Sequence, residues 1–275
     1  MNLAGKVVVV TGASMGIGEA IAKEFIERGA SVVFSSRDLQ RTEAARQRVG
    51  ALDRSMAIVC DVTKRAALAN LLSQTLARFQ RVDVWVNNAG YGLMDSVESM
   101  DMDQCRQMFD TNLFGTIDAM QLVIPVMKKQ GSGTIINIAS TAGHIAVPFM
   151  AAYCATKHAM RAIGNAANVE LRGTGVNVLT VCPGYISTDF SVNAVKGKEQ
   201  LRLSAAGKRR ITADRVARAA IRGYVGGKRE LSVPWRDYIV IKLYENLPGI
   251  VDYAMARMLA PADQVMAEAK AARKR

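Results

Sequence analysis

The chain contains 275 residues, of which 50% are hydrophobic and 22% are charged, enough apolar material for one sizeable core. The four cysteines and two histidines show no spacing typical of a zinc site or a disulfide framework. We therefore expect no metal and a reducing, cytoplasmic environment. No segment is long and apolar enough to span a membrane, and we expect no signal peptide before the first strand.

The net charge of +12 is concentrated in one part of the chain. Between Lys196 and Glu230 there are eleven basic and three acidic residues. Such a segment would attract nucleic acid, anionic lipid or an acidic substrate, or it would form an ordinary solvated face. No aromatic interleaving supports RNA or DNA recognition, so we expect no nucleic-acid partner.

Short β-branched segments alternate with amphipathic segments along most of the chain, which indicates a parallel sheet covered by helices on both faces. We expect residues 1–234 to form this α/β domain and residues 235–275 to form a C-terminal helical extension of it. Two of the expected helices run over about 103–129 and 151–172. The expected strands lie near residues 7–10, 32–34, 57–60, 84–86, 134–138, 177–181 and 230–233.

A glycine-rich turn, TGASMGIG at residues 11–18, follows the first strand and precedes a helical segment. Glycines let the backbone approach a pyrophosphate, and the N–H groups and dipole of a helix N-terminus favour its negative charge. The spacing is GxxxGxG and differs from the GxGxxG dinucleotide fingerprint. We predict a dinucleotide site that includes Gly12, Ser14, Gly16, Ile17 and Gly18.

Three further motifs accompany this turn in order: NNAG at residues 87–90, Tyr153 with Lys157 four residues later, and Pro183-Gly184 after the sixth strand. Together the four resemble the classical branch of the short-chain dehydrogenase/reductase family over roughly the first 235 residues. The resemblance implies a Rossmann-like, doubly wound sheet with strand order 3-2-1-4-5-6-7. It also implies that a nicotinamide cofactor contacts Asp61, Val62, Asn88, Ala89, Gly90, Tyr153, Lys157, Pro183, Gly184, Ile186 and Thr188.

The end of the second strand bears on the choice between NAD and NADP. A carboxylate there would bind the ribose 2′-hydroxyl of NAD and repel a 2′-phosphate. This chain has Ser36 and Arg37 instead, and a guanidinium can pair with a phosphate. NADP is favoured, with Arg37 as an ordinary solvated residue the alternative. Met15 takes the place of the basic residue that the family often has in the turn, which leaves NAD use open.

The chemical step is expected to involve four side chains. Tyr153 and Lys157 lie one helical turn apart, so they project from one face of the helix. An ammonium beside the phenol lowers the pKa of Tyr153 and makes it a better acid and base near neutral pH. Ser140 matches the family serine that binds the substrate oxygen, with Thr141 as the neighbouring competitor. Asn112 matches the family asparagine that links Lys157 to solvent through a water.

These residues predict an NADP(H)-dependent oxidoreductase that interconverts a carbonyl and an alcohol. The alternatives are a 3-oxoacyl-thioester reductase and a non-catalytic dinucleotide-binding scaffold. The resemblance implies a homodimer or homotetramer. An apolar ketone, aldehyde or alcohol, such as a steroid, retinoid or fatty chain, is expected as substrate because the residues placed near the nicotinamide are mostly apolar. They are Leu93, Met94, His144, Ile145, Val147, Phe149, Tyr185 and Phe190.

The C-terminal segment departs from the compact family pattern. Apolar residues recur at largely helical spacing over 235–247, Pro248 breaks the helix, and 250–259 has a second apolar face. The chain ends on basic residues at 273–275. An apolar face beside basic charge suits a helix lying at a membrane surface, while the alternative is packing on the chain's own site or on a neighbouring subunit.

Overall fold

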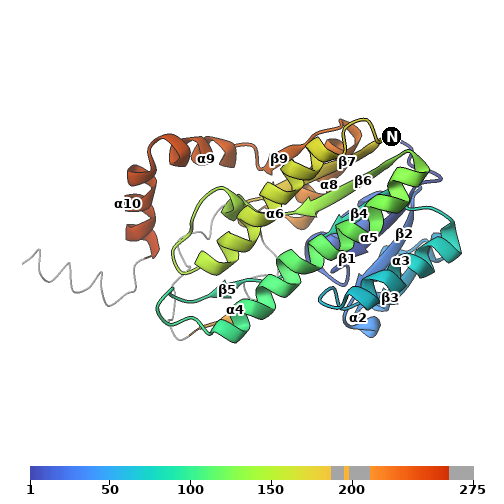
Figure 1. The fold of residues 1–275 in the computed structure, drawn as a ribbon, viewed down its shortest axis with the longest axis horizontal. Helices are drawn as coiled ribbons and strands as arrows, with labels where there is room; N and C mark the ends of the chain where they lie inside the picture. The colour runs from blue at the N-terminus through green and yellow to red at the C-terminus, as the bar shows by residue number, and fades with distance from the viewer. Residues whose placement is uncertain (187–194, 198–210, 260–275) are drawn as a thin grey trace, which may run out of the picture.

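The computed structural model of the chain describes residues 1–186, 195–197 and 211–259 (Figure 1). Its centre is a seven-stranded parallel sheet in the order β3-β2-β1-β4-β6-β7-β9. Counted along the chain, this is the predicted order 3-2-1-4-5-6-7. Its strands are β1 (Val7–Thr11), β2 (Ser31–Ser36), β3 (Ser55–Val59), β4 (Val84–Asn87), β6 (Gly133–Ile138), β7 (Val176–Pro183) and β9 (Glu230–Val233).

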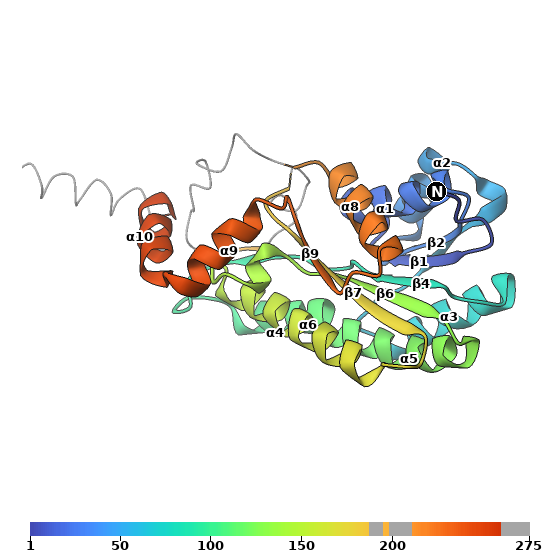
Figure 2. The same cartoon turned by 90° about the horizontal axis from the view of Figure 1, so that it is seen from above.

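Helices cover both faces of this sheet (Figure 2). One face carries α1 (Gly16–Glu27), α2 (Leu39–Val49) and α8 (Ala213–Val225), and the other carries α3 (Arg65–Phe79), α5 (Gly115–Gln130) and α6 (Ala151–Glu170). In β1, Val8 and Val10 pack against the first layer and Val9 packs against the second. Because both faces of the strand are buried, its sequence is continuously apolar.

The helix expected over 103–129 is divided by a change of hydrogen-bond pattern. It consists of α4 (Met102–Phe109), capped by the Asp101 side chain, then a π-helical turn over Asp110–Phe114, and then α5. The prediction of one regular helix was therefore wrong at this turn. The Asn112 side chain, in the middle of the turn, is bonded to the backbone of Tyr91. Such turns often occur at functional sites.

A second, two-stranded parallel sheet lies beside the main one and was not predicted. It pairs β5 (Leu93–Met94) with β8 (Val195–Lys196). The Asp95 amide donates to the Phe149 carbonyl, so this small sheet is joined to the segment that precedes α6. It places buried Leu93 and Met94 near the carboxyl ends of the central strands.

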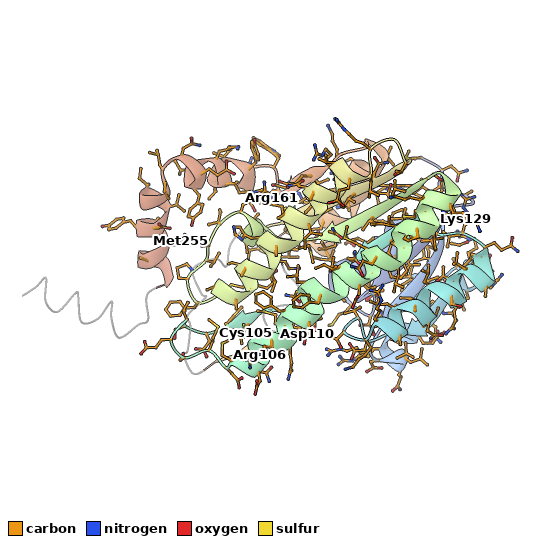
Figure 3. The ribbon with its side chains drawn as sticks, in the orientation of Figure 1. Cys105, Arg106, Asp110, Lys129, Arg161 and Met255 are labelled. Carbon is orange, nitrogen blue, oxygen red and sulfur yellow. The ribbon has the colours of Figure 1, made fainter. Side chains whose placement is uncertain are left out.

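The last two helices form an arm that reaches away from the sheet (Figures 1 and 2). The arm consists of α9 (Asp237–Asn246) and α10 (Pro248–Leu259), on which Met255 is labelled in Figure 3. Ile241 is the only buried side chain of α9, and Val251 is buried in α10. None of the helices within the described residues has the length and apolar character to cross a membrane. The large apolar residues that the arm exposes are Trp235, Tyr238, Ile239, Val240, Leu243, Leu247, Ile250 and Tyr253.

The predicted boundary at residue 234 stays a prediction, although β9 ends at Val233, next to it. Much of the basic segment lies outside the described residues, because 198–210 are not among them. The same holds for the basic end of the chain at 273–275.

Candidate active site

The glycine-rich turn is fastened to the end of β4 by two polar side chains. The Asn88 Nδ2 group donates to the carbonyls of Thr11 and Gly12, each at 3.0 Å. The Thr11 hydroxyl accepts from the amides of Asn88 at 3.1 Å and Ala89 at 3.2 Å. Two neighbouring parallel strands therefore present their loops as one unit. Thr11 was not predicted as a site residue, and its position immediately before Gly12 is the signal that could have identified it.

Two glycines allow this close approach. Gly12 has φ +65°, a left-handed conformation that suits glycine. A Cβ atom at Gly18 would collide with the Gly12 carbonyl oxygen and lie 2.5 Å from the Asn88 amide nitrogen. The backbone path of the turn therefore depends on the absence of a side chain at Gly18.

The turn leads directly into the N-terminus of α1, which begins at Gly16. Met15 precedes the helix and supplies no side-chain cap, in contrast to Asp38 before α2. Gly12, Ser14, Gly16 and Ile17 are partly exposed. The first N–H groups of a helix lack partners within the helix and attract an anion, so this terminus fits a pyrophosphate.

Ser36, the last residue of β2, and Arg37, which follows it, differ in the contacts that their side chains make. The Ser36 hydroxyl lies 2.6 Å from the Thr42 hydroxyl and donates to the Asp38 carbonyl at 3.1 Å, so it supports the start of α2. Arg37 is exposed, and none of the described residues forms a hydrogen bond or ion pair with its guanidinium. Burial raises the pKa of the Tyr91 hydroxyl, and the Arg37 charge opposes this shift. Arg37 therefore faces the same end of the sheet as the glycine-rich turn.

The residues after β3 and β4 lie along this same edge. The Asp61 carboxylate accepts from the Thr63 amide at 3.0 Å and the Thr63 hydroxyl at 2.9 Å, which fixes its orientation. Val62 is buried, and Gly90 is exposed. These positions agree with a cofactor that extends across the carboxyl ends of the strands.

Asn112 connects the π-helical turn to the loop after β4. Its Oδ1 accepts from the Tyr91 amide at 3.0 Å, and its Nδ2 donates to the Tyr91 carbonyl at 2.9 Å and to the Thr156 hydroxyl at 3.2 Å. A Cβ atom at Gly90 would lie 2.8 Å from Asn112 Oδ1 and 3.8 Å from the Lys157 amine. The Asn112 side chain and the Lys157 amine therefore both lie close to Gly90. Thr156, which completes this contact, was not predicted.

Lys157 is buried on α6, with its amine aimed at the end of β6. Its Nζ donates to the Ile138 carbonyl at 2.9 Å and lies 5.7 Å from the centroid of the Tyr153 ring. Burial lowers the pKa of Lys157 to about 8, because the charged form loses its hydration. A hydrogen bond thus holds Lys157 in place, and its amine lies beside the Tyr153 ring, as the four-residue spacing predicts.

Tyr153 and Ser140 are in contact at the end of β6. Ser140 lies just beyond the strand, which ends at Ile138, and caps a 3₁₀ turn by accepting from the Ala142 amide at 3.1 Å. Its hydroxyl donates to the Pro183 carbonyl at 3.3 Å. Burial raises the pKa of Tyr153 well above its usual value, and a hydrogen bond with Ser140 opposes that shift. Burial, rather than the neighbouring lysine, dominates the pKa of Tyr153 in this structure.

The remaining predicted cofactor residues follow β7. Pro183 ends the strand and is buried, Gly184 and Ile186 are partly exposed, and Ile186 forms a β-bridge with Ile211. Thr188, predicted to contact the nicotinamide carboxamide, lies outside the described residues. So does Phe190, which was expected near the substrate.

Comparison with known proteins agrees with this arrangement. Residues 6–199 match the family model described as short chain dehydrogenase. The chain belongs to the short-chain dehydrogenase family. It is therefore an NAD(P)-dependent oxidoreductase, which argues against the non-catalytic scaffold.

Three similar proteins illustrate the relationship. An uncharacterised oxidoreductase of Staphylococcus saprophyticus is 38% identical over 220 residues, covering 79% of this chain and 89% of that protein. The ketoacyl reductase HetN of Nostoc is 37% identical over 189 residues, covering 68% of this chain and 65% of HetN. The structure of 3-ketoacyl-(acyl-carrier-protein) reductase from Brucella melitensis complexed with NADH is 27% identical, with a TM-score of 0.77, and covers 84% of this chain and 98% of that one.

The packing of Gly18 generates a prediction about dinucleotide binding. A Gly18→Ala substitution should weaken the binding of NADPH and NADH by about tenfold, because the added methyl group displaces the turn or Asn88. Calorimetric titration with each cofactor measures this. Gly249→Ala is the control, since no heavy atom lies within 4 Å of a Cβ built there. Equal affinity of the Gly18→Ala variant and the parent would contradict the proposed role of the turn.

Proposed function

We propose that this short-chain dehydrogenase interconverts an apolar carbonyl compound and the corresponding alcohol, with NADP(H) as its preferred cofactor. The observation that carries the proposal is the convergence of Ser140, Tyr153 and Lys157 at the carboxyl end of β6. All three side chains meet within reach of the Pro183 and Ile138 carbonyls. This convergence also favours catalysis over a purely structural role for the Tyr-Lys pair.

The residues present fit a dinucleotide cofactor. The uncapped N-terminus of α1 suits the pyrophosphate, and Asp61 with the loop at 88–90 suits the adenosine. The Arg37 guanidinium is exposed and forms no ion pair with a described residue. It suits a ribose 2′-phosphate, which is the basis for preferring NADP. When bound, a nicotinamide cofactor supplies or accepts the hydride of the redox reaction.

The protein's own part in the reaction is to move a proton and orient the substrate. Tyr153 exchanges a proton with the substrate oxygen, which the Ser140 hydroxyl orients by a hydrogen bond. The Lys157 ammonium favours the tyrosinate form. Asn112 lies close to Gly90, as the Lys157 amine does, and from there it supports the path by which the lysine reaches solvent.

The substrate class rests on the side chains at this end of the sheet. Leu93, Met94 and Ile145 are buried there, and Tyr185 is 37% exposed. These side chains offer apolar surface to a ketone, an aldehyde or an alcohol. The names of HetN and the Brucella melitensis protein support the alternative of a 3-oxoacyl thioester.

Two steps test the reaction and the role of Tyr153. A panel of ketosteroids, long-chain aldehydes and 3-oxoacyl thioesters, followed by NADPH absorbance, identifies the substrate. With that substrate, Tyr153→Phe should lower turnover by about 100-fold or more, because the proton relay is lost. NADPH binding should persist in the variant, and Tyr224→Phe is the control. Near-parental turnover of Tyr153→Phe would overturn the mechanism.

The preference for NADP is tested by reversing one charge. Arg37→Asp should weaken NADPH binding by about 10- to 100-fold, since a favourable partner of the phosphate becomes a repelling one. NADH binding should change far less. Arg41→Asp is the matched control, because Arg41 is an exposed arginine on the adjacent α2. Equal losses for the two cofactors would remove Arg37 from the cofactor site.

We further propose that the enzyme is cytoplasmic, forms a homodimer or homotetramer, and touches membranes through its arm. All four cysteines are free and buried, as suits a reducing compartment.

The helices expected to associate expose apolar side chains. Phe114, at the junction of α4 and α5, is 53% exposed, and Val169 on α6 is 60% exposed. Ile239 and Leu243 on α9 and Leu247 just after it are exposed, at positions i, i+4 and i+8.

Membrane contact is tested by co-sedimentation with vesicles of phosphatidylcholine and phosphatidylglycerol. The parent protein should pellet, and a variant with Ile239, Leu243 and Leu247 replaced by Ser should remain in solution, because the apolar contact is lost at unchanged charge. Val59, Val97 and Val169, which are also exposed, are replaced by Ser in the control. If all three proteins sediment alike, the arm is a packing element and the membrane contact is refuted.

A further inference from the structure

Behind the Ser140–Tyr153 pair lies a second group of reactive side chains, outside the proposed reaction. His144 follows the 3₁₀ turn that Ser140 caps, Cys182 lies in β7, and Glu230 begins β9. One ligand atom from each of the three lies within 4.8 Å of the others. Three segments far apart in sequence therefore bring a nitrogen, a sulfur and an oxygen ligand together.

His144 lacks a hydrogen-bond partner at this place. Its side chain is 3% exposed, and neither ring nitrogen makes a hydrogen bond of acceptable geometry within the described part of the chain. Nevertheless, its Nε2 atom lies 3.2 Å from Oε1 of Glu230. The buried imidazole is therefore close to one carboxylate but makes no well-formed hydrogen bond with it, and an ion held between the two side chains would satisfy both.

The spacing of these atoms suits a tetrahedral ion. Imidazole nitrogen and carboxylate oxygen ligands of Zn²⁺ each lie about 2.0–2.2 Å from the metal, so at the tetrahedral angle they are about 3.3 Å apart. The distance between His144 Nε2 and Glu230 Oε1 matches this separation. A thiolate ligand would lie about 3.6 Å from each of the other two. The three ligand atoms lie within 4.8 Å of one another, so binding would draw them closer together.

We propose that His144, Cys182 and Glu230 form a binding site for a single Zn²⁺ ion, with water as the fourth ligand. The set of one nitrogen, one sulfur and one oxygen ligand is typical of zinc rather than of Mg²⁺ or Ca²⁺, which prefer oxygen ligands alone. The site adjoins the predicted cofactor and substrate residues, because Cys182 precedes Pro183 and His144 was expected near the nicotinamide, but its three side chains take no part in the proposed reaction.

Arg161 orients the Glu230 carboxylate that would bind the ion. Arg161 Nε donates to Glu230 Oε2 at 2.8 Å, which fixes the carboxylate and leaves Oε1 facing His144. Figure 3 labels Arg161 on α6. The ion pair with Arg161 keeps the Glu230 carboxylate charged. The Glu230 side chain is 25% exposed, which gives the ion a route from solvent.

Cys182 must lose its proton when the ion binds. Burial raises the pKa of the Cys182 thiol to about 12, so the thiol is protonated near neutral pH in the absence of an ion. Binding forms a bond between zinc and sulfur, breaks the S–H bond and releases the proton to solvent. The affinity should therefore increase with pH.

The experiment is a titration of the metal-free, full-length protein with Zn²⁺ by calorimetry, and with Co²⁺ by absorbance. We expect one ion per chain with a dissociation constant of about 1 μM or lower. Cobalt should give the near-ultraviolet charge-transfer band of a thiolate ligand and the visible bands of a tetrahedral ion. Cys182→Ser and His144→Gln should each weaken zinc binding by at least about tenfold, and Cys182→Ser should remove the charge-transfer band.

Cys60→Ser is the matched control, because Cys60 is a free, buried cysteine in a different cluster, and it should bind both ions like the parent. Circular dichroism checks the fold of each variant. If Cys182→Ser does not fold, His144→Gln and Glu230→Gln decide the outcome. Absence of saturable binding would overturn the proposal, as would binding that the folded variants retain unchanged.

Discussion

The candidate site depends on one buried cation, the Lys157 ammonium, and on the hydrogen bond that holds it at the end of β6. Lys157 carries a charged group into the interior, where an ammonium without a partner would be strongly unfavourable. The Ile138 carbonyl, at the last residue of β6, accepts from it at 2.9 Å. This bond joins α6 to the carboxyl end of the central sheet and thereby sets the position of Tyr153, one helical turn earlier. Ser140, two residues beyond Ile138, meets the phenol as a consequence of the same geometry.

The second constraint is the junction between the loops of β1 and β4. Asn88 donates hydrogen bonds to the Thr11 hydroxyl and the Thr11 carbonyl across neighbouring strands, so the glycine-rich turn cannot move independently of the loop that carries Gly90. Gly90 in turn lies against Asn112 and near Lys157. The glycine-rich turn and the residues around Lys157 are therefore connected through the loop after β4.

The local patterns of the sequence predicted most of the fold. Continuous apolar strands such as β1 and the alternation with helices indicated the doubly wound sheet, and the order of the strands followed from the family resemblance. The motifs also placed Ser140, Tyr153 and Lys157, since a helical spacing of four residues and a strand end determine where side chains point. What they lacked was any local signal for contacts between distant segments.

Three features show why the rest escaped prediction. The π-helical turn around Asn112 arises from bonds to Tyr91, 21 residues away, so helical periodicity alone predicts an uninterrupted helix. His144, Cys182 and Glu230 are separated by dozens of residues. The pairing of β7 with β9 brings Cys182 and Glu230 together, and the 3₁₀ turn beside β7 adds His144. The pKa of Tyr153 is raised mainly by its burial, and no short sequence motif indicates how deeply a residue of α6 is buried.

The arm is joined to the main sheet by a short, hydrogen-bonded connection. Only three residues separate β9 from α9, and the Asp237 amide of α9 donates to the Pro234 carbonyl. The Val233 carbonyl, at the end of β9, accepts from the Gly184 amide, next to Pro183. Pro183 in turn accepts from the Ser140 hydroxyl. A few hydrogen bonds and a short stretch of backbone therefore connect the first residue of α9 with Ser140.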